Sequence, residues 1–575
     1  MADIDVRTRL NRRFSDLEKD RSSYIDHWKE LQDFILPRRG RFLDTDRNDG
    51  SKKHTKQLDN SATLAARTLA SGMMAGLTSP ARPWFKLDAP DPGLKQYRPV
   101  KEWLHAVELR LREIFARSNL YNTLHNVYKE IGVFGTAPAL FASHFEEVVR
   151  GYPITVGSYA LGLGSDLTVD TLYRDIPMTA KMVYQKFGKD RVSLSIKNAI
   201  DNHNYNQPVV VRHCIEPNLD DIGYDGPEMA FVQDAPWRSI YWEKKGDMDT
   251  SPLLEVRGYN SQPFMAPRWD VNGTDTYGSS PGMEALGDTI QLQTMQRWKG
   301  EGIHKQVRPP MIAPTALRNA HKTTVPGGVT YYDGQQGMRG FEPAFQVNFQ
   351  LQFLLEDIKD TKDRISRAFY EDLFLMLARS DRREITAREI EERHEEKLIM
   401  LGPVLERLED ELLDPLIDRV FNIALANEII PPPPQEMQDG EIKVEYISIL
   451  AQAQKAVAIN SLERTAQFVG GLANIQAAGG GPAQVVDKVD FDRMVEDYGQ
   501  SIGISPLILR DQKDVDAGRE EQAKKAEQAQ QMAMAEQASK MAKNVGSIPT
   551  DEGSIGGNIM DQVTGAGGTP NVGQG

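Results

Sequence analysis

The chain has 575 residues, 40% of them hydrophobic and 26% charged, with a formal net charge of −14. These values are ordinary for a globular protein with several subdomains, and they argue against a protein that wraps DNA tightly, because affinity for phosphates comes mainly from clustered lysine and arginine. The single cysteine, Cys214, excludes an intrachain disulfide framework and a thiolate metal cluster. The most apolar runs are short and interrupted by charge, so we expect neither a signal peptide nor a membrane span.

The first part of the chain is predicted to be helical. Apolar side chains recur at steps of three and four residues from the N-terminus until Pro37, which ends the first helix. Asp59 or Asn60 can cap the second helix. Four helices are expected in all, at 5–36, about 59–77, 99–117 and 120–132.

Between about 135 and 275 the pattern changes to strands. Segments such as RGYPITVG at 150–157 and VVVRHCIEP at 209–217 are rich in β-branched and aromatic residues and are bounded by Gly and Pro. One helix is expected to interrupt them near 178–200. We therefore predict a mixed or antiparallel sheet here, in a chain that is α+β and mostly helical as a whole.

Two long helices bracket a small insertion. The first, 281–306, has Ser280 as a suitable N-cap and Pro281 at its first helical position. The second covers about 350–377 and carries a continuous apolar stripe. The insertion at 307–349 is expected to hold loop and strand, so this part should be a helical hairpin with a cap.

A third long helix is expected from Thr386, where TARE forms a capping box with Glu389, to about Glu428. Gly402 and Pro403 are expected to kink it, because proline has no backbone N–H to donate.

The C-terminal part begins with an unambiguous helix stop, PPPP at 431–434. A strand is expected in EIKVEYIS at 441–448, helices at 450–510, and an Ala/Gln-rich helix at about 517–543. The tail from 544 onward is Gly-rich and has few apolar residues to bury, so it is expected to be disordered.

One motif suggests an enzyme. GSSPG at 278–282 matches the G-x-S-x-G nucleophile elbow and precedes a helix. The residue after the serine is Pro281, which lacks the N–H that an oxyanion hole needs. Ser280 as a plain helix cap explains the same residues, and we expect no catalytic residue.

Metal and phosphate motifs are incomplete. DTDRNDG at 44–50 lacks the Gly and Glu that a calcium loop needs at its sixth and twelfth positions. GLGS at 162–165 lacks the Gly-Lys-Ser/Thr ending of a phosphate-binding loop. The ten histidines show no metal-ligand spacing, so no cofactor is expected.

One basic cluster lies between two long helices. The segment ARSDRREITARE at 378–389 carries Arg379, Arg382, Arg383 and Arg388. Charge runs usually face water, so a solvated connecting loop is one interpretation. The other is a loop at the tip of two stiff helices that contacts phosphates without reading bases. One copy of this loop would be a weak site for phosphates, whereas many copies around a ring would form a continuous belt of positive charge.

Four segments stand out in the chain. They are LDNSATLAARTLASGMMAGLTSPARPWFKL at 58–87, YGSSPGMEALGDTIQLQTMQ at 277–296, REITAREIEERHEEKLIMLGPVLERLEDELLDPLIDRVF at 383–421 and PPPPQEMQDGEIKVEYISILAQAQKA at 431–456. Together they resemble the portal (head-to-tail connector) family of short-tailed bacteriophages. They occur in the order of the family, and the resemblance extends over most of residues 1–510. The tail after 517 carries no part of the resemblance.

The resemblance implies the phage portal fold, with a wing, a two-helix stem, a clip and a helical crown. Its parts would be the wing at 1–280, stem helices at 281–306 and 350–373, the clip at 307–349, a tunnel loop at 374–386, a long kinked wing helix and strand at 387–448, the crown at 449–516, and an Ala/Gln-rich helix with a disordered tail at 517–575.

The resemblance also implies a function. Portal subunits form a ring, usually of twelve, at one capsid vertex, where DNA enters during packaging and leaves during ejection. The implied partners are further copies of the chain, major capsid protein, scaffold protein, terminase motor, tail adaptor proteins and double-stranded DNA, without membrane insertion. The chain would be made in the host cytoplasm and reside in the virion.

In such a ring, Arg379, Arg382 and Arg383 of the tunnel loop are candidates to hold DNA transiently. The anionic ring as a whole would keep the duplex centred by repulsion. An internal virion or scaffold-like protein is the alternative, but it would lack the strand region at 135–275 and show longer heptads. A nucleic-acid enzyme would need carboxylates clustered at strand ends beside a lysine or histidine, and no such constellation is seen.

Overall fold

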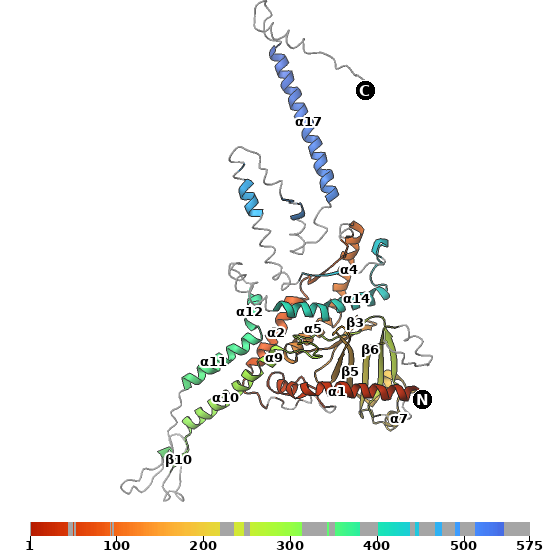
Figure 1. Ribbon diagram of the computed structural model, residues 1–575, viewed down its shortest axis with the longest axis vertical. Helices are drawn as coiled ribbons and strands as arrows, with labels where there is room; N and C mark the ends of the chain where they lie inside the picture. Colours follow the sequence, from red (N-terminus) through yellow and green to blue (C-terminus); the bar gives the residue numbers. More distant parts are fainter. Residues whose placement is uncertain are drawn as a thin grey trace, which may run out of the picture. The chain divides into compact units, whose positions relative to one another are not determined.

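The computed structural model describes most of the chain in two compact units, Met1–Met494 and Val495–Gly575 (Figure 1). The described residues are 2–43, 50, 53, 55–91, 94, 97–218, 235–245, 253–312, 342–343, 351–379, 401–437, 443–447, 466–473, 476, 489–490, 492–494 and 512–545. Several predictions fall outside them: most of the clip, the capping box at Thr386, most of the crown and the Gly-rich tail. The second unit contains one long helix, α17 (Gln512–Val545), which confirms the Ala/Gln-rich helix.

The predicted N-terminal helices are confirmed. They are α1 (Ala2–Phe34), α2 (Ser61–Leu77), α4 (Arg98–Arg117) and α5 (Leu120–Phe134). At the start of α2, Asn60 makes no side-chain capping bond, and Asp59 instead accepts a hydrogen bond from the Ser61 N–H at 2.9 Å. The last of these helices ends at Gly135, whose φ of 79° lies in the left-handed region that glycine adopts without strain.

The strand region forms a five-stranded sheet that is antiparallel throughout. Its order is β4 (Tyr159–Leu163), β5 (Val169–Thr179), β6 (Pro208–Pro217), β7 (Trp237–Glu243) and β8 (Glu255–Tyr259). The N-terminal part of α1 packs on one face, where Phe14 meets Tyr173 and the buried Cys214. Two short helices pack with residues of the other face, through Val183 and Ile196.

These two short helices replace the single helix expected near 178–200. They are α6 (Ala180–Phe187) and α7 (Leu194–Asp201). Gly188 ends the first with a φ of 86°, which a continuing helix could not contain.

Two smaller ladders tie distant segments together. One is a three-stranded sheet of β3 (Val148–Pro153), β2 (Ala139–His144) and β9 (Phe264–Met265). The other pairs β1 (Phe85–Asp88) antiparallel with β12 (Lys443–Tyr446), which confirms the strand predicted after the proline run. The chain therefore returns to its N-terminal helices after the long helix.

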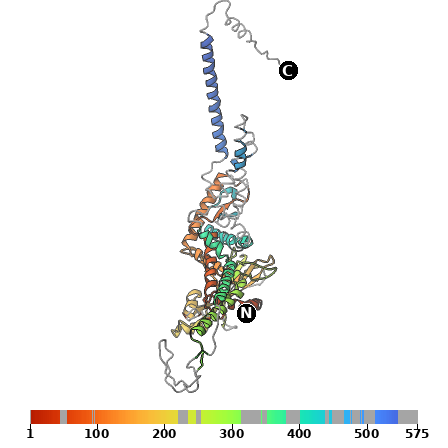
Figure 2. The ribbon, with the colours of Figure 1, turned by 90° about the vertical axis from the view of Figure 1, so that its left-hand side faces the viewer.

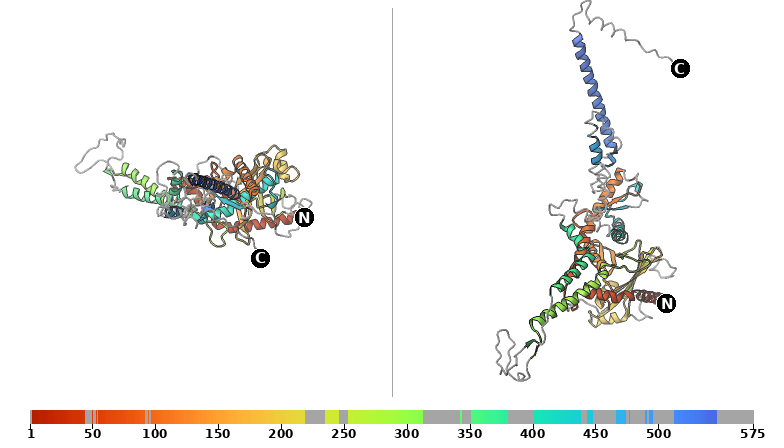
Figure 3. Two further views of the ribbon diagram at one scale, coloured as in Figure 1. Left: turned by 90° about the horizontal axis from the view of Figure 1, so that it is seen from above. Right: turned by 60° about the vertical axis from the view of Figure 1, so that its left-hand side comes forward.

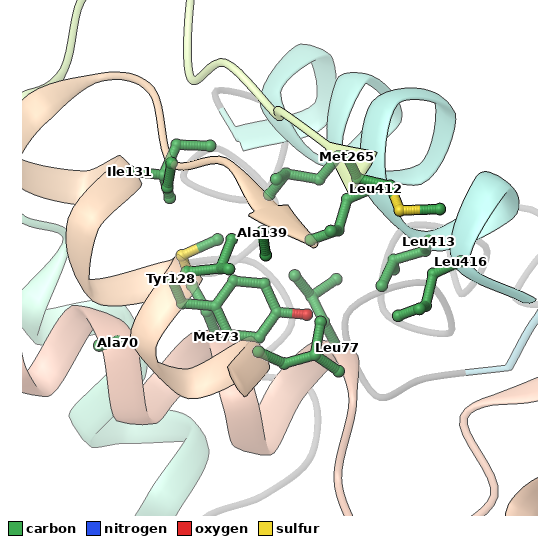
Figure 4. Packing of buried hydrophobic residues seen from close by; sticks show 14 of the residues in the cluster. Ala70, Met73, Leu77, Tyr128, Ile131, Ala139, Met265, Leu412, Leu413 and Leu416 are labelled. Atoms are coloured by element: carbon green, nitrogen blue, oxygen red, sulfur yellow. The ribbon is translucent and has the colours of Figure 1, made fainter. Parts of the chain in front are cut away.

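The largest hydrophobic core joins α2, α5 and the described part of the long helix (Figure 4). Tyr128 is fully buried at its centre, close to Met73 and Leu77 of α2 and facing Leu412 and Leu416. The Tyr128 hydroxyl is satisfied by the hydroxyl of Thr78 at 3.1 Å. Burial of this many large side chains makes the helical centre a rigid base for the elements attached to it.

The predicted helical hairpin is confirmed. A short helix α9 (Pro281–Glu284) leads into α10 (Leu286–Val307), which lies beside α11 (Leu351–Ala368). The two long helices extend together away from the sheets (Figure 1, Figure 2 and Figure 3). Beyond them, β10 (Met311–Ile312) pairs antiparallel with β11 (Glu342–Pro343).

The second long helix is shorter than predicted. After Ala368 the chain turns at Tyr370, whose φ is 53°, and a separate helix α12 (Glu371–Arg379) follows. The predicted start of a loop at 374 is therefore wrong, because residues 374–379 are helical. The physical reason is packing, since Leu373 and Phe374 are buried and need a regular helix to face α2.

The third long helix is described from 401 onward. Residues 401–408 are helical, a π-helical turn follows (η2, Glu409–Leu413), and then α14 (Asp414–Ala426). Pro415 has no N–H to donate to the Glu411 carbonyl, which accounts for the wide turn before it. The bond expected to be lost at Pro403 involves Ile399, which lies outside the described residues.

Candidate functional site

The three arginines predicted to form the site are not brought together in the described residues. Arg379 is the last residue of α12, and its side chain, like Arg382 and Arg383, lies outside the described part. The structure does describe α12, the helix that precedes this segment.

That helix is fixed on α2. A Cβ on Gly72 would lie 2.2 Å from the ring of Phe374, so α12 sits as close to α2 as a glycine permits. The first turn of α12 is also held, because Ser366 donates a hydrogen bond to Glu371 at 2.5 Å. The segment after Arg379 therefore begins at the end of a well-anchored helix.

The base of the hairpin of α10 and α11, called the stem below, is held by a polar hub around Asp59. The side-chain amide oxygen of Gln293 accepts hydrogen bonds from the N–H groups of Leu58 and Asp59 at 2.6 and 2.8 Å. Lys362 of α11 reaches the Asp59 carboxylate at 2.7 Å, and Gln296 of α10 donates to it at 2.8 Å. One carboxylate therefore joins both stem helices to the start of α2.

The contacts of that hub also shift the pKa of Asp59. Burial alone would raise the pKa of Asp59, but its hydrogen bonds with Lys362 and Ser61 outweigh burial and lower the pKa. The carboxylate is thus held in its ionised form.

Within the stem, the two helices contact each other through a narrow apolar seam. Leu292 and Met295 of α10 are buried, as are Ile358 and Ile365 of α11. Arg364 of α11 pairs with Asp288 of α10 at 3.1 Å. This pair is partly exposed, so it aligns the helices more than it stabilises them.

None of the described residues covers the outer half of the stem. From Arg297 onward, every described residue of α10 is exposed or only partly buried. Trp298 and Val307 are 57% and 73% exposed, and Phe353 of α11 is 64% exposed. Exposed apolar side chains of this size are typical of a surface that contacts another molecule.

The GSSPG segment joins the stem to the end of α5. The Ser280 hydroxyl accepts a hydrogen bond from the Met283 N–H at 3.2 Å and donates one to the Val133 carbonyl at 2.7 Å. The helix-cap interpretation is therefore confirmed. A Cβ on Gly282 would lie 2.7 Å from the Val133 carbonyl oxygen, so the second glycine permits the contact with the end of α5.

A largely buried ion pair connects the segment after β9 to the π-helical turn. Arg268 pairs with Glu411 at 2.7 Å and also donates to the carbonyl oxygens of Leu167 and Asp275 at 3.0 and 3.1 Å. The π turn presents Glu411 to this guanidinium. Glu411 and Leu167 lie 143 and 101 residues away from Arg268 in the sequence, and Asp275 lies 7 residues away.

A second buried carboxylate lies on α5. Glu130 is 3% exposed and pairs with Arg39, which follows α1, at 3.1 Å. Burial raises the pKa of Glu130 to about 7, and the opposing effect of Arg39 is smaller.

This shift predicts a pH dependence of stability. Between its ordinary pKa of 4.5 and about 7, the folded chain holds a proton at Glu130 that the unfolded chain releases. The free energy of unfolding should therefore fall as pH rises through this window, by at most ~1.4 kcal/mol per pH unit from this group. Thermal melts at pH 4.5, 5.5, 6.5 and 7.5 should show that slope reduced in Glu130→Gln. An unchanged slope in the variant would contradict the assignment.

Neither a metal centre nor a membrane helix is found in the described part of the chain. No group of three or more His, Cys, Asp or Glu side chains there could hold a metal ion. Of the helices in the same residues, none is long and apolar enough to cross a membrane.

Comparisons with known proteins agree over nearly the whole chain. The family described as bacteriophage head to tail connecting protein matches residues 7–509. The portal protein of Salmonella phage epsilon15 is 43% identical over 547 residues, which cover 95% of this chain and 96% of that relative. The probable portal protein of Bordetella phage BPP-1 is 43% identical over 552 residues, 96% of this chain and 97% of that relative. Among solved structures, the virion of a native gene transfer agent particle contains a chain that is 12% identical, with a TM-score of 0.33 over 77% of this chain and 96% of its own.

Proposed function

This chain belongs to the bacteriophage head to tail connecting protein family, and from that premise we propose that it is the portal-vertex subunit, which joins capsid to tail. It is a structural connector of the virion and not an enzyme. The observation that carries the proposal is the 43% identity to a portal protein across 95% of the chain.

The proposed assembly is a closed ring of about twelve copies, with a central channel for DNA during packaging and ejection. The exposed apolar side chains of the outer stem support it, because a ring would cover them. The net charge of −14 per chain would make the ring anionic, so that it guides DNA without gripping it. Its partners would be capsid and scaffold proteins, the terminase motor and tail adaptors, after synthesis in the host cytoplasm.

We assign the parts of the portal fold to this chain as follows. The wing is 1–280 with the helix and strand at 387–448, the stem is α10 with α11, and the clip is 307–349. The tunnel loop follows α12 and so begins after Arg379, the crown is 449–516, and 517–575 is an appended helix and tail.

Electron microscopy of the purified protein tests the ring directly. Class averages should show closed rings, with a mass about twelve times the 64.5 kDa of one chain. A folded protein that stays monomeric at high concentration would contradict the proposal.

The end of α12 and the tunnel loop are proposed to contact DNA phosphates, through Arg379 of the helix and Arg382 and Arg383 of the loop. Replacing all three with alanine should leave rings and procapsids intact, because exposed substitutions change stability by roughly 0.5 kcal/mol or less per site. Encapsidated DNA should fall severalfold, since the positive charge facing the phosphates is lost. Ring formation and DNA content of particles are measured in parallel.

A matched control removes the same charge elsewhere. Lys524, Lys525 and Lys540 are exposed on α17, and their triple alanine variant should package normally. Normal DNA content in the arginine variant would refute the channel role. Failed rings would instead place the arginines at a contact between subunits.

A further inference from the structure

The two stem helices carry opposite charges on their outward faces. Residues on the side of α10 away from α11 recur at steps of four and three. They include three cations and one carboxylate: Arg297, Glu301, Lys305 and, just after the end of the helix, Arg308. The matching row on α11 has three carboxylates and one cation, and so a net negative charge: Glu356, Asp360, Asp363 and Arg367. We call these the basic row and the acidic row, and every member is exposed.

The rows cannot pair with each other inside one copy. The seam between the helices is formed by Leu292 and Met295 on α10 and by Ile358 and Ile365 on α11. Each row lies about half a helical turn from its own seam, so the rows face opposite sides of the stem. Within the described residues, Asp360 is the one row member that forms an ion pair, with Arg364 of its own helix.

Apolar side chains flank both rows. Trp298, next to Arg297, is 57% exposed, and Phe353, one turn before Glu356, is 64% exposed. A protein contact usually combines such a large apolar anchor with a charged rim. Both faces of the stem therefore have the composition of an interface, with opposite signs.

A head-to-tail ring requires two different, complementary faces on each subunit. We propose that the basic row of one copy docks on the acidic row of the next copy, with Trp298 and Phe353 buried at that contact. This inference rests on the proposed ring. It adds which faces of neighbouring stems are in contact, and that their opposite charges make the contact specific. The partner that binds each face is a second copy of this chain, because every copy carries both a basic row and an acidic row.

Charge reversal on one row at a time gives a sharp test. Variant A, Arg297→Glu with Lys305→Glu, makes both rows acidic. Variant B, Glu356→Lys with Asp363→Lys, makes both rows basic. Each variant alone should lose at least tenfold in ring fraction, measured by mass photometry and negative-stain images at equal protein concentration. An equimolar mixture should recover rings, because every A–B contact then joins opposite charges, and native mass spectrometry should find A and B in equal numbers.

Two controls keep the test interpretable. Lys181→Glu with Lys189→Glu, exposed positions on α6 and just after it, changes the net charge as variant A does and should form rings like the wild type. A chain carrying the substitutions of both A and B should form rings alone, which shows that the substitutions permit folding.

The outcomes separate this inference from the ring itself. A monomeric wild type would remove the ring and the inference together. If the wild type forms rings and variant A or variant B also forms rings alone, the contact between the rows is overturned and the ring stands. The same holds if variant A forms rings that fail to retain DNA, because the cations would then contact the duplex. Loss of rings in A and B without recovery in the mixture would overturn it too, since the charges would then act within one copy.

Discussion

Replacing Arg268 with alanine should lower the free energy of unfolding by about 3–5 kcal/mol. Arg268 is 5% exposed and binds Glu411 through its side chain, while its own backbone N–H donates to the same carboxylate at 2.9 Å. Without the guanidinium, Glu411 keeps a poorly solvated charge, and two carbonyl oxygens lose their donor. Urea unfolding followed by circular dichroism measures the change.

A nearby surface pair provides the control for this prediction. Arg407 lies one helical turn before Glu411 and contacts Asp270 at 3.4 Å, with the two side chains 31% and 61% exposed. Exposed pairs contribute ~0–1 kcal/mol, so Arg407→Ala should hardly change the unfolding curve. If the free energy of unfolding fell equally in the two variants, the loss would come from removing any arginine in this region and not from breaking the buried pair.

The Arg268 variant should also affect assembly. The Arg268–Glu411 pair joins the segment after β9 to the long helix, which follows the proposed tunnel loop in the sequence. A subunit that loses this connection should yield fewer rings at temperatures where the wild type still assembles.

Periodicity predicted the helices well because each helix repeats its apolar contacts every three or four residues. The stripe through Leu292 and Met295 on α10, and the stripe through Ile358 and Ile365 on α11, are local patterns that the fold uses unchanged. The division of charge between these two helices was also present in the sequence. Its meaning required the seam to be known, because the outward faces are defined only once the helices are paired.

The features that were missed depend on partners far away in the sequence. Gln293 bonds the backbone at Leu58, 235 residues earlier, and Arg268 binds Glu411, 143 residues later. Neither residue lies in a local pattern that differs from an ordinary surface position. The break at Tyr370 is similar, because α12 turns to pack on α2 and no proline or glycine marks the turn.

The arginine site is a case of the opposite kind. Composition identified the cluster at Arg379, Arg382 and Arg383, and the structure adds the anchored helix that precedes it. The assignment of these side chains to a channel therefore depends on the packaging experiment.

Gly282→Ala is expected to be the second strongly destabilising substitution. The new methyl group would lie 2.7 Å from the Val133 carbonyl oxygen and 2.8 Å from the Val133 Cα. Both are backbone atoms, so relief requires the stem and α5 to separate, which would also stretch the Ser280 hydrogen bond to the same carbonyl. Overpacking of this kind costs about 1–3 kcal/mol, and thermal melts should show a clearly lower midpoint.

Gly287→Ala is the matched control, because this glycine lies in the first turn of α10 and a Cβ there meets nothing within 4 Å. Alanine in a helix is favoured over glycine by roughly 0.5–1 kcal/mol, so this variant should melt slightly higher than the wild type. The two substitutions add the same methyl group five positions apart, and only the first lies against another backbone. If both variants melted alike, close approach of the stem to α5 would not be what Gly282 provides.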